Sequence, residues 1–351
     1  MGATYLYAVI PGGESRIFDV AGIGGRSRVY SLVHGDLAAV VSASPRGTYH
    51  GLQRDEAVGY LVAHQRVVER VMQSHPLLPV KFGTVLPNEA RVRRLLAQGH
   101  TIFRAALEKF AGLKQMEVVV FWDLPQIFGE IGEEEPIARL KAEIASRPSQ
   151  DARAERILVG QMVQESLQRR LTSLRDRLLP ALQEVALDLV INPTMHESMV
   201  ANAALLVDEE GRATLEQRLE QLDAEWGGQL TIRCVGPLPP YSFATVEAQV
   251  PSFEAVDEAR RQLGLDEVVT PVDIKKGYRR VARQAHPDMN LNQPGADAHM
   301  AEITRAYEFL SSYAEGQGQE AEPARQSVCR FDRRTVEKTV LVAVRRQELA
   351  A

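Results

Sequence analysis

A short basic segment followed by a His-Pro-Asp triplet is the most chemically distinctive feature of the sequence. The triplet is His286, Pro287 and Asp288. Five cationic side chains precede it at spacings that gather on one side of a helix, because residues three and four apart are neighbours on a helical surface. Like charges on one face repel one another, so such a surface gains most by meeting an acidic partner. The cationic residues are Lys275, Lys276, Arg279, Arg280 and Arg283.

The opposite side of the same segment is apolar. Ile274, Tyr278 and Val281 recur at helical spacing and predict packing against a second helix. This segment and a second apolar helix further along the chain predict a helical hairpin, whose two helices are joined by a polar loop. The facing apolar residues of the second helix are Ile303, Ala306, Tyr307 and Leu310.

The usual signatures of catalysis are missing. The glycine-rich run at residues 22–25 lacks both the GxGxxG spacing and the lysine of a phosphate-binding loop, so it predicts a turn. His196 is followed by a glutamate but lacks the second histidine of a HExxH zinc site, which leaves a loop histidine. There is no GxSxG sequence, and neither Cys234 nor Cys329 lies in a nucleophile motif. We therefore predict no catalytic residue, no metal site, no cofactor and no enzymatic activity.

Composition places the chain among ordinary globular proteins. It has 351 residues, a formal net charge of -5 and 45% hydrophobic residues. This length exceeds what one hydrophobic core usually organises, so we expect at least two domains. The mild acidity argues against a general nucleic-acid binder, whose field should be basic. Two distant cysteines, and no run apolar enough for a membrane helix, indicate a cytoplasmic protein.

Residues 1–113 predict an α+β domain, with a β-hairpin around the His-Gly-Asp turn at 34–36. One face of its first helix is apolar, and we expect that face to be buried, with His64 at the border of the core. The apolar face consists of Val58, Leu61, Val62, Val68, Val71 and Met72. The expected strands are 4–10, 29–33, 37–43 and 77–82, and the expected helices are 53–73, 88–98 and 101–112.

Residues 114–250 predict a second α+β domain. Strand-like runs and amphipathic helices alternate in the order β-α-β-β-α-β, which is the ferredoxin-like order. An acidic loop is expected at 130–135, and Pro180 is expected to bend or restart a long helix. The expected strands are 116–121, 185–191, 198–207 and 229–235, and the expected helices begin near 136, 151 and 214.

The composition turns helical after Pro251. Residues 251–315 predict three helices, at 255–263, 271–285 and 296–313. Residues 316–351 predict a linker and C-terminal tail, because 316–326 is polar and poor in apolar residues. One strand-like run returns at 339–344.

Four segments along the first 250 residues resemble the gas vesicle protein F/L family. They are the opening Tyr-Leu-Tyr-Ala-Val at 5–9 and three stretches rich in proline, glycine and aromatic residues. Leu238 departs from the family, in which an aromatic residue stands between the prolines. Core packing is the competing reading for the aromatic positions Phe82, Tyr241 and Phe243. The motif positions are Pro79, Phe82, Gly83, Trp122, Gly236, Pro237, Pro239, Pro240, Tyr241 and Phe243.

This resemblance implies an accessory protein of gas vesicle assembly that binds the small hydrophobic shell subunit of the GvpA type. It also implies a two-domain α+β fold, and a location in the cytoplasm or in the vesicle as a minor, gas-facing component. The shell subunit and other gas vesicle accessory proteins are the implied partners. A subunit with one very apolar face must be kept from collapsing on itself, and an exposed sheet edge or apolar groove would shield that face.

The hairpin around the triplet resembles the J-domain of DnaJ-type co-chaperones. The resemblance implies that His286, Pro287 and Asp288 contact the ATPase domain of an Hsp70 and stimulate ATP hydrolysis. The tyrosine pair common in the first J-domain helix is absent, and a fourth helix is not evident. Two alternatives remain open. The hairpin is a packing or docking module without Hsp70 activity, or the whole chain is a general J-domain co-chaperone whose N-terminal region binds varied clients.

Overall fold

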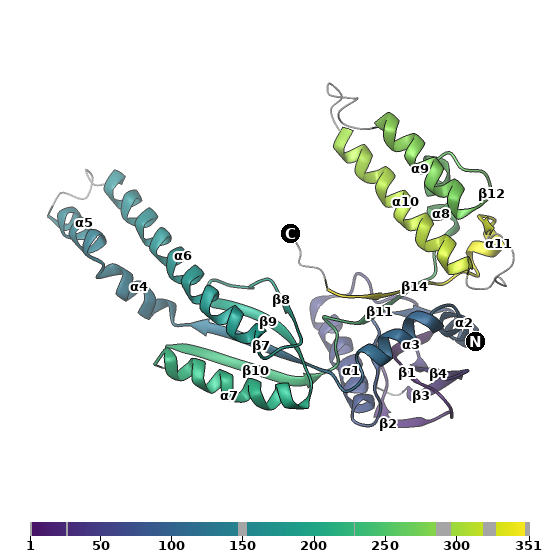
Figure 1. Cartoon of the computed structure of the whole chain (residues 1–351), viewed down its shortest axis with the longest axis horizontal. Coiled ribbons are helices and arrows are strands. Elements are labelled where there is room, and N and C mark those ends of the chain that lie inside the picture. The colour runs from purple at the N-terminus through teal and green to yellow at the C-terminus, as the bar shows by residue number, and fades with distance from the viewer. Residues whose placement is uncertain are drawn as a thin grey trace. The chain divides into compact units, whose positions relative to one another are not determined.

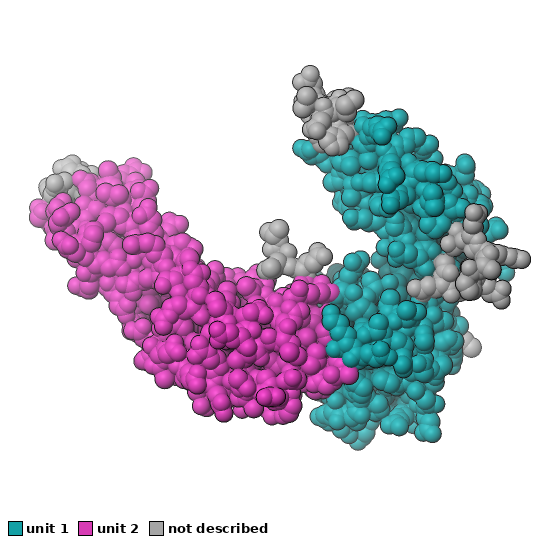
Figure 2. Space-filling view, viewed as in Figure 1, with its two compact units in different colours: residues 1–109, 244–345 teal, residues 110–243, 346–351 magenta. Residues whose placement is uncertain are grey.

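The fold was analysed in a computed structural model, which describes residues 2–25, 27–146, 153–227, 229–285, 296–318 and 328–347 (Figure 1). The chain forms two compact units (Figure 2). Unit 1 comprises residues 1–109 and 244–345, and unit 2 comprises residues 110–243 and 346–351. Unit 1 therefore contains both the expected N-terminal domain and the J-like segment. The chain is of mixed α/β type.

The first part of unit 1 is a mixed assembly of helices around one sheet. The sheet has the order β2-β3-β4-β1-β5, and β6 also pairs with β1. Strands β1 and β4 are buried on almost every residue, so both faces of the sheet are covered. The strands are β1 Thr4–Pro11, β2 Ile17–Ala21, β3 Arg28–His34, β4 Leu37–Ala43, β5 Leu78–Pro79 and β6 Val85–Leu86. The helices are α1 Arg54–Met72, α2 Glu89–Gln98 and α3 His100–Lys109.

Helix α1 corrects one sequence-based expectation. Val68 and Val71 are buried as predicted, but Val58, Leu61 and Val62 are 52%, 48% and 50% exposed. The sheet covers only the C-terminal half of this helix, so the regular apolar spacing continues past the end of the core. His64 is fully buried and does not lie at the border of the core.

The second part of unit 1 carries the helical hairpin. Ser252 caps α8 by accepting the Ala255 N–H at 3.2 Å, and α9 begins at a proline, which suits the first helical turn. The helices are α8 Phe253–Gln262, α9 Pro271–Ala285, α10 Ala296–Gly318 and α11 Arg333–Val336. The strands are β11 Thr245–Gln249, β12 Val268–Val269, β13 Cys329–Arg330 and β14 Leu341–Arg345.

The described part of the C-terminal tail, 316–318 and 328–347, holds more structure than the one strand expected at 339–344, and most of the expected linker at 316–326 lies outside the described residues. Helix α10 continues through Gly316, and β13 pairs with β12. Strand β14 then pairs antiparallel with β11 along five residues. The tail gains order because Phe331 and Val336 bury their side chains in the core of the helical hairpin.

Unit 2 is a four-stranded antiparallel sheet in the order β10-β7-β9-β8. The first and last strands of the unit are therefore neighbours. Helices α6 and α7 contribute apolar side chains to one core with the sheet. The strands are β7 Lys114–Trp122, β8 Asp188–Ile191, β9 Met199–Val207 and β10 Leu230–Leu238. The helices are α4 Leu124–Gly132, α5 Glu135–Ala145, α6 Arg153–Gln183 and α7 Glu209–Glu225.

Two local expectations for unit 2 were wrong. The acidic stretch 130–135 is mostly helical, because the Asp123 side chain caps α4 by accepting the Gln126 N–H. Pro180 does not restart the long helix: α6 continues through it to Gln183. Leu178 and Leu182, on either side of the proline, are buried against the sheet and hold the last turns in place.

Candidate functional site

The helical hairpin packs as the sequence predicts. Ile274 and Leu310 are buried in one core, and the rings of Tyr278 and Tyr307 stack with centroids 4.3 Å apart. The end of α8 also enters this core, because Leu263 and Leu265 are buried. The hairpin is therefore a packed unit with its own hydrophobic core.

The basic residues of α9 do not act as one set. Lys275, Arg279 and Arg283 are exposed, and the Lys276 ammonium lies 3.8 Å from the Asp273 carboxylate. Arg280 is also exposed, but its guanidinium has partners within the hairpin. Its guanidinium donates to the carbonyls of Leu263 and Gly264 at 3.0 and 2.9 Å. These carbonyls end α8 and need a donor, so Arg280 fastens α8 to α9.

The predicted Hsp70-contacting triplet, His286, Pro287 and Asp288, lies outside the described residues. The structure does show where its segment begins and ends. Helix α9 ends at Ala285 and α10 begins at Ala296. In Figure 1 this end of the hairpin is opposite the end where α11 and β14 lie.

The base of the hairpin is fastened to the first part of unit 1 by Gln98 on α2, whose side chain is only 3% exposed. Its amide nitrogen donates to the Gly316 carbonyl at 2.7 Å, and its amide oxygen accepts the Val340 N–H at 3.3 Å. Arg91 donates to the Lys338 carbonyl at 2.6 Å. The hairpin is thus attached through the C-terminal part of α10 and the tail.

The family-motif positions of unit 1 meet around buried His64. The Tyr5 hydroxyl lies 3.0 Å from His64 Nδ1 and accepts the Gly83 N–H at 3.0 Å. Burial lowers the pKa of His64 to about 4, and a hydrogen bond with the Val80 backbone only partly opposes this. Pro79 is buried in β5, and Phe82 is half-buried with its ring edge-on to His64. These positions build the core and offer no reactive group.

The motif positions of unit 2 are also structural. The Trp122 indole donates to the Glu197 carbonyl at 3.1 Å. Gly236 has a φ of +155°, which side chains rarely adopt, and a Cβ there would lie 3.0 Å from the Gln115 carbonyl oxygen, so the position favours glycine. Phe243 is buried and Tyr241 half-buried, as core packing predicts. Pro237 is exposed, whereas Pro239 and Pro240 are buried where the chain leaves β10.

Unit 2 contains an open groove with a volume of about 460 Å³ that the sequence did not reveal. Its apolar lining comes from α4, α6, the last residue of β7 and the region where α7 meets β10. Gln229 and Leu230, at the start of β10, form one side. The apolar lining residues are Trp122, Ile127, Leu174, Trp226 and Leu230.

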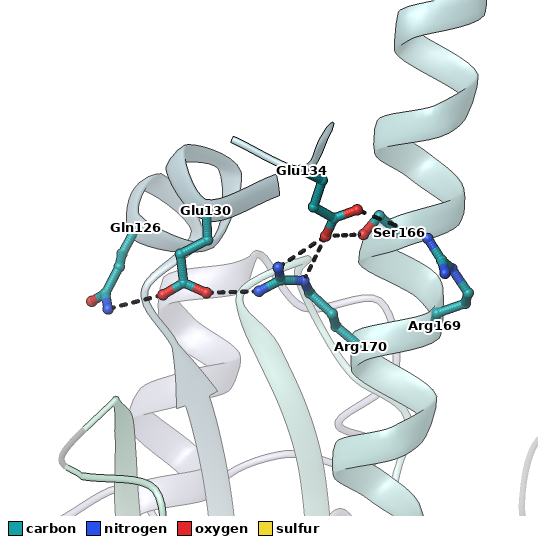
Figure 3. Close-up of polar contacts among 6 residues, drawn as sticks. All are labelled: Gln126, Glu130, Glu134, Ser166, Arg169 and Arg170. Carbon is teal, nitrogen blue, oxygen red and sulfur yellow. Dashed lines mark hydrogen bonds and ion pairs between the residues drawn. The ribbon is translucent and has the colours of Figure 1, made fainter. Parts of the chain in front are cut away.

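A charged cluster forms part of the lining of the groove, and its contacts are drawn in Figure 3. Arg170 donates to Glu130 at 2.7 Å and to Glu134 at 2.9 Å, and Ser166 donates to Glu134 at 2.7 Å. These bonds from Ser166 and Arg170 hold the pKa of Glu134 below its ordinary value. Arg169 lies farther out, 3.9 Å from Glu134. The cluster ties α4 and the start of α5 to α6; it neutralises its own charges and shapes the groove.

The described part of the chain contains no group of three or more His, Cys, Asp or Glu side chains placed to hold a metal ion. His196 lies on a loop, as predicted, and stacks on Phe121. Within the same residues, no helix is both long and apolar enough to cross a membrane.

Comparison with known sequences identifies two segments. Residues 3–245 match the family described as gas vesicle synthesis protein GvpL/GvpF, and residues 261–315 match the DnaJ domain. Gas vesicle protein L of Streptomyces sp. strain CB03234 is 31% identical, over 69% of this chain and 92% of that protein. Gas vesicle protein F of Nostoc sp. strain PCC 7120 is 25% identical, over 69% of this chain and 98% of that protein.

Solved structures agree with this match. The crystal structure of gas vesicle protein GvpF from Microcystis aeruginosa has a TM-score of 0.54 at 25% identity, covering 69% of this chain and 98% of that one. That of GvpF from Anabaena sp. PCC7120 has a TM-score of 0.58 at 24% identity and the same coverage. Fold and surfaces thus define a two-unit α/β protein with an added J-type hairpin. The chain belongs to the gas vesicle GvpL/GvpF family and carries a DnaJ domain after the family region.

Proposed function

We propose that this protein is a non-enzymatic assembly factor that binds the small apolar wall subunit of gas vesicles before the subunit enters the wall. The family match, which spans segments of both units, supports this role. A wall that encloses gas needs an apolar face, and a subunit with such a face associates with itself in water unless a partner covers it. The protein would act in the cytoplasm with other gas vesicle accessory proteins and remain as a minor vesicle component.

We further propose that the DnaJ domain recruits an Hsp70, which couples release of the wall subunit to ATP hydrolysis. The attachment of the hairpin to unit 1 is the observation that supports this proposal. Gln98 and the tail fasten its base, while Lys275, Arg279 and Arg283 are exposed on α9. A fastened base holds the basic face in one orientation toward an acidic partner.

The Hsp70 part is tested by single-turnover ATP hydrolysis with the organism's own Hsp70. Arg279→Glu should abolish most of the stimulation, because it reverses one charge of the basic face. His286→Gln should do the same if the triplet acts as in J-domains. Arg261→Glu is the matched control, since Arg261 is an exposed arginine on α8. No stimulation by the wild type would show that the hairpin is only a docking module, and equal stimulation by all four proteins would show that neither Arg279 nor His286 is needed.

The wall-subunit part is tested by co-expression of the tagged protein with the wall subunit of the same organism and by recovery of the pair. Removal of residues 251–351 is not a clean test, because it would also remove β14 from β11 and expose Gln98. Full-length variants are needed. No recovery of the wall subunit, together with binding of many denatured proteins, would favour a general co-chaperone instead.

We also infer that unit 2 belongs to the ferredoxin-like class. Its strands β7, β8, β9 and β10 follow one another in the chain with helices after β7 and after β9. The sheet order β10-β7-β9-β8 is the order that the split β-α-β arrangement requires.

A further inference from the structure

The two edges of the unit 2 sheet differ in how they are covered. Strand β8 has four residues, and Arg346 from the C-terminal segment donates to its Asp188 carboxylate and Leu189 carbonyl at 2.7 and 3.0 Å. Strand β10 has nine residues and is the terminal strand on the other side. Natural sheets usually shorten, charge or cover such edges, because an open edge pairs with other chains. Strand β10 is the long edge of this sheet, and no strand among the described residues pairs with its outer side.

The register shows which backbone groups of β10 face outward. Trp122 on β7 donates its N–H to Ser198 on the β9 side. Backbone groups alternate along a strand, so those of the preceding residue, Phe121, point to β10, where its partner is Thr231. Thr231 and Arg233 therefore bond to β7. The N–H and C=O groups of Leu230, Ile232 and Cys234 point away from the sheet.

The side chains along this edge suit an apolar strand. Ile232 is half-buried, and Cys234 and Val235 are exposed. Arg233 is the charged residue in this stretch, and its guanidinium lies over the Phe121 ring. Leu230, the first residue of β10, also lines the apolar groove. An added strand would thus find backbone partners at the edge and an apolar pocket at its end, which is how strand addition combines affinity with side-chain selection.

We propose that the β10 edge binds an extended apolar segment of the wall subunit by strand addition, with one large apolar side chain in the groove beside Leu230. This rests on the proposed function and names the surface that performs it. Pairing would shield a segment of the subunit that otherwise pairs with further subunits.

A second copy of this chain fits the same surface less well. Antiparallel pairing of two β10 strands about Ile232 would place Cys234 of the second copy opposite Leu230 and give the groove no large apolar side chain. Pairing about Arg233 would set two like charges directly opposite one another.

The test uses Cys234→Pro in the full-length protein. Proline removes the outward N–H at this position, and edge strands tolerate it because no bond to β7 is lost. Cys234→Ser is the matched control, since it keeps the N–H. After co-expression with the wall subunit, recovery of the pair should fall at least about tenfold with Cys234→Pro and stay unchanged with Cys234→Ser.

The possible results separate the two proposals. If the wild type does not recover the wall subunit, the proposed function fails. If the wild type and Cys234→Pro recover it equally, only the edge proposal fails. Loss of binding with Leu61→Ser alone would move the site to the exposed apolar residues of α1. If Cys234→Pro abolishes a dimer seen by light scattering and leaves wall-subunit binding intact, the edge joins two copies of the chain, which overturns the proposal.

A second measurement needs no variant and covers the case in which Cys234→Pro fails to fold. Cys234 is exposed and Cys329 is buried, so a maleimide reagent reports on the β10 edge. The bound wall subunit should slow this alkylation at least about tenfold. An unchanged rate in the complex would overturn the proposal.

Discussion

The Tyr5 hydroxyl lies 3.0 Å from Nδ1 of His64, so two residues 59 positions apart share a buried hydrogen bond. The same hydroxyl accepts the Gly83 N–H, so its own proton points to the histidine, which is neutral and accepts at Nδ1. Three segments, β1, α1 and the turn after β5, are thereby joined by one small polar network. Buried networks of this kind specify one arrangement of the core when all members are bonded.

The first prediction concerns acid stability. Unit 1 should lose stability as the pH falls from 6.5 to about 4. In the unfolded chain His64 has its ordinary pKa of 6.5, whereas in the folded protein its pKa is about 4, so protons bind the unfolded chain more strongly in this range. The loss should level off below that range. Between about pH 7.5 and about pH 5 this histidine should account for about 2 kcal/mol of unfolding free energy. Urea unfolding at the two pH values measures it.

The control for this prediction is His64→Gln, which does not titrate. His75 is half-buried and its pKa is also lowered, chiefly by burial, so the wild type carries a second contribution that the variant keeps. The difference in pH dependence between the two proteins isolates His64. Identical pH dependence in both would contradict the prediction.

The second prediction concerns Gly83. Its φ of +84° disfavours side chains, and a Cβ there would lie 3.3 Å from the Tyr49 Cβ. Gly83→Ala should therefore destabilise unit 1 by about 2 kcal/mol. Gly51 has a similar φ of +73° with open space around it, so Gly51→Ala should cost about 1 kcal/mol for the backbone alone. Thermal unfolding of the two variants compares them, and equal shifts would mean that Tyr49 yields to the added methyl.

The third prediction concerns the attachment of the hairpin. Gln98→Ala should leave the Gly316 carbonyl and Val340 N–H without their partner, at a cost of about 1–3 kcal/mol. Amide exchange should become faster at Val340 and along β14, and stay slow in the core of α9 and α10. Gln65→Ala is the control, because the Gln65 side chain donates to Glu69 on its own helix. If amide exchange at Val340 stays slow in Gln98→Ala, β14 does not need the Gln98 side chain to stay paired.

The fourth prediction compares two adjacent arginines. Arg170→Met should destabilise unit 2 by about 1 kcal/mol, because Glu130 and Glu134 both lose their bonds to the guanidinium and keep only those to Gln126 and Ser166. Arg169→Met should be nearly neutral, since Arg169 is 76% exposed and lies 3.9 Å from Glu134. Chemical unfolding followed by tryptophan fluorescence suits both, because Trp122 and Trp226 line the same groove. A larger effect from Arg169→Met would contradict the geometry in Figure 3.

The sequence by itself was enough for features that depend on neighbours in the chain. Helical spacing correctly paired the apolar face of α9 with that of α10, because both faces repeat at the helical period. The helix expected at 88–98 forms, and Asn88 caps it, since capping needs only residues three positions apart. The family motifs and the J-type segment could likewise be recognised from the order of residues within short stretches of the sequence.

Only the tertiary structure decided which surfaces are covered. Leu61 has the spacing of a core residue but is half exposed, because the buried residues of α1 lie only in its C-terminal half. Arg280 belongs by spacing to the basic face, yet two carbonyls at the end of α8 engage it. The tail is ordered by residues far away in the chain, and β10 is an open edge because the strand order leaves it last. Such properties depend on long-range partners, which no local pattern specifies.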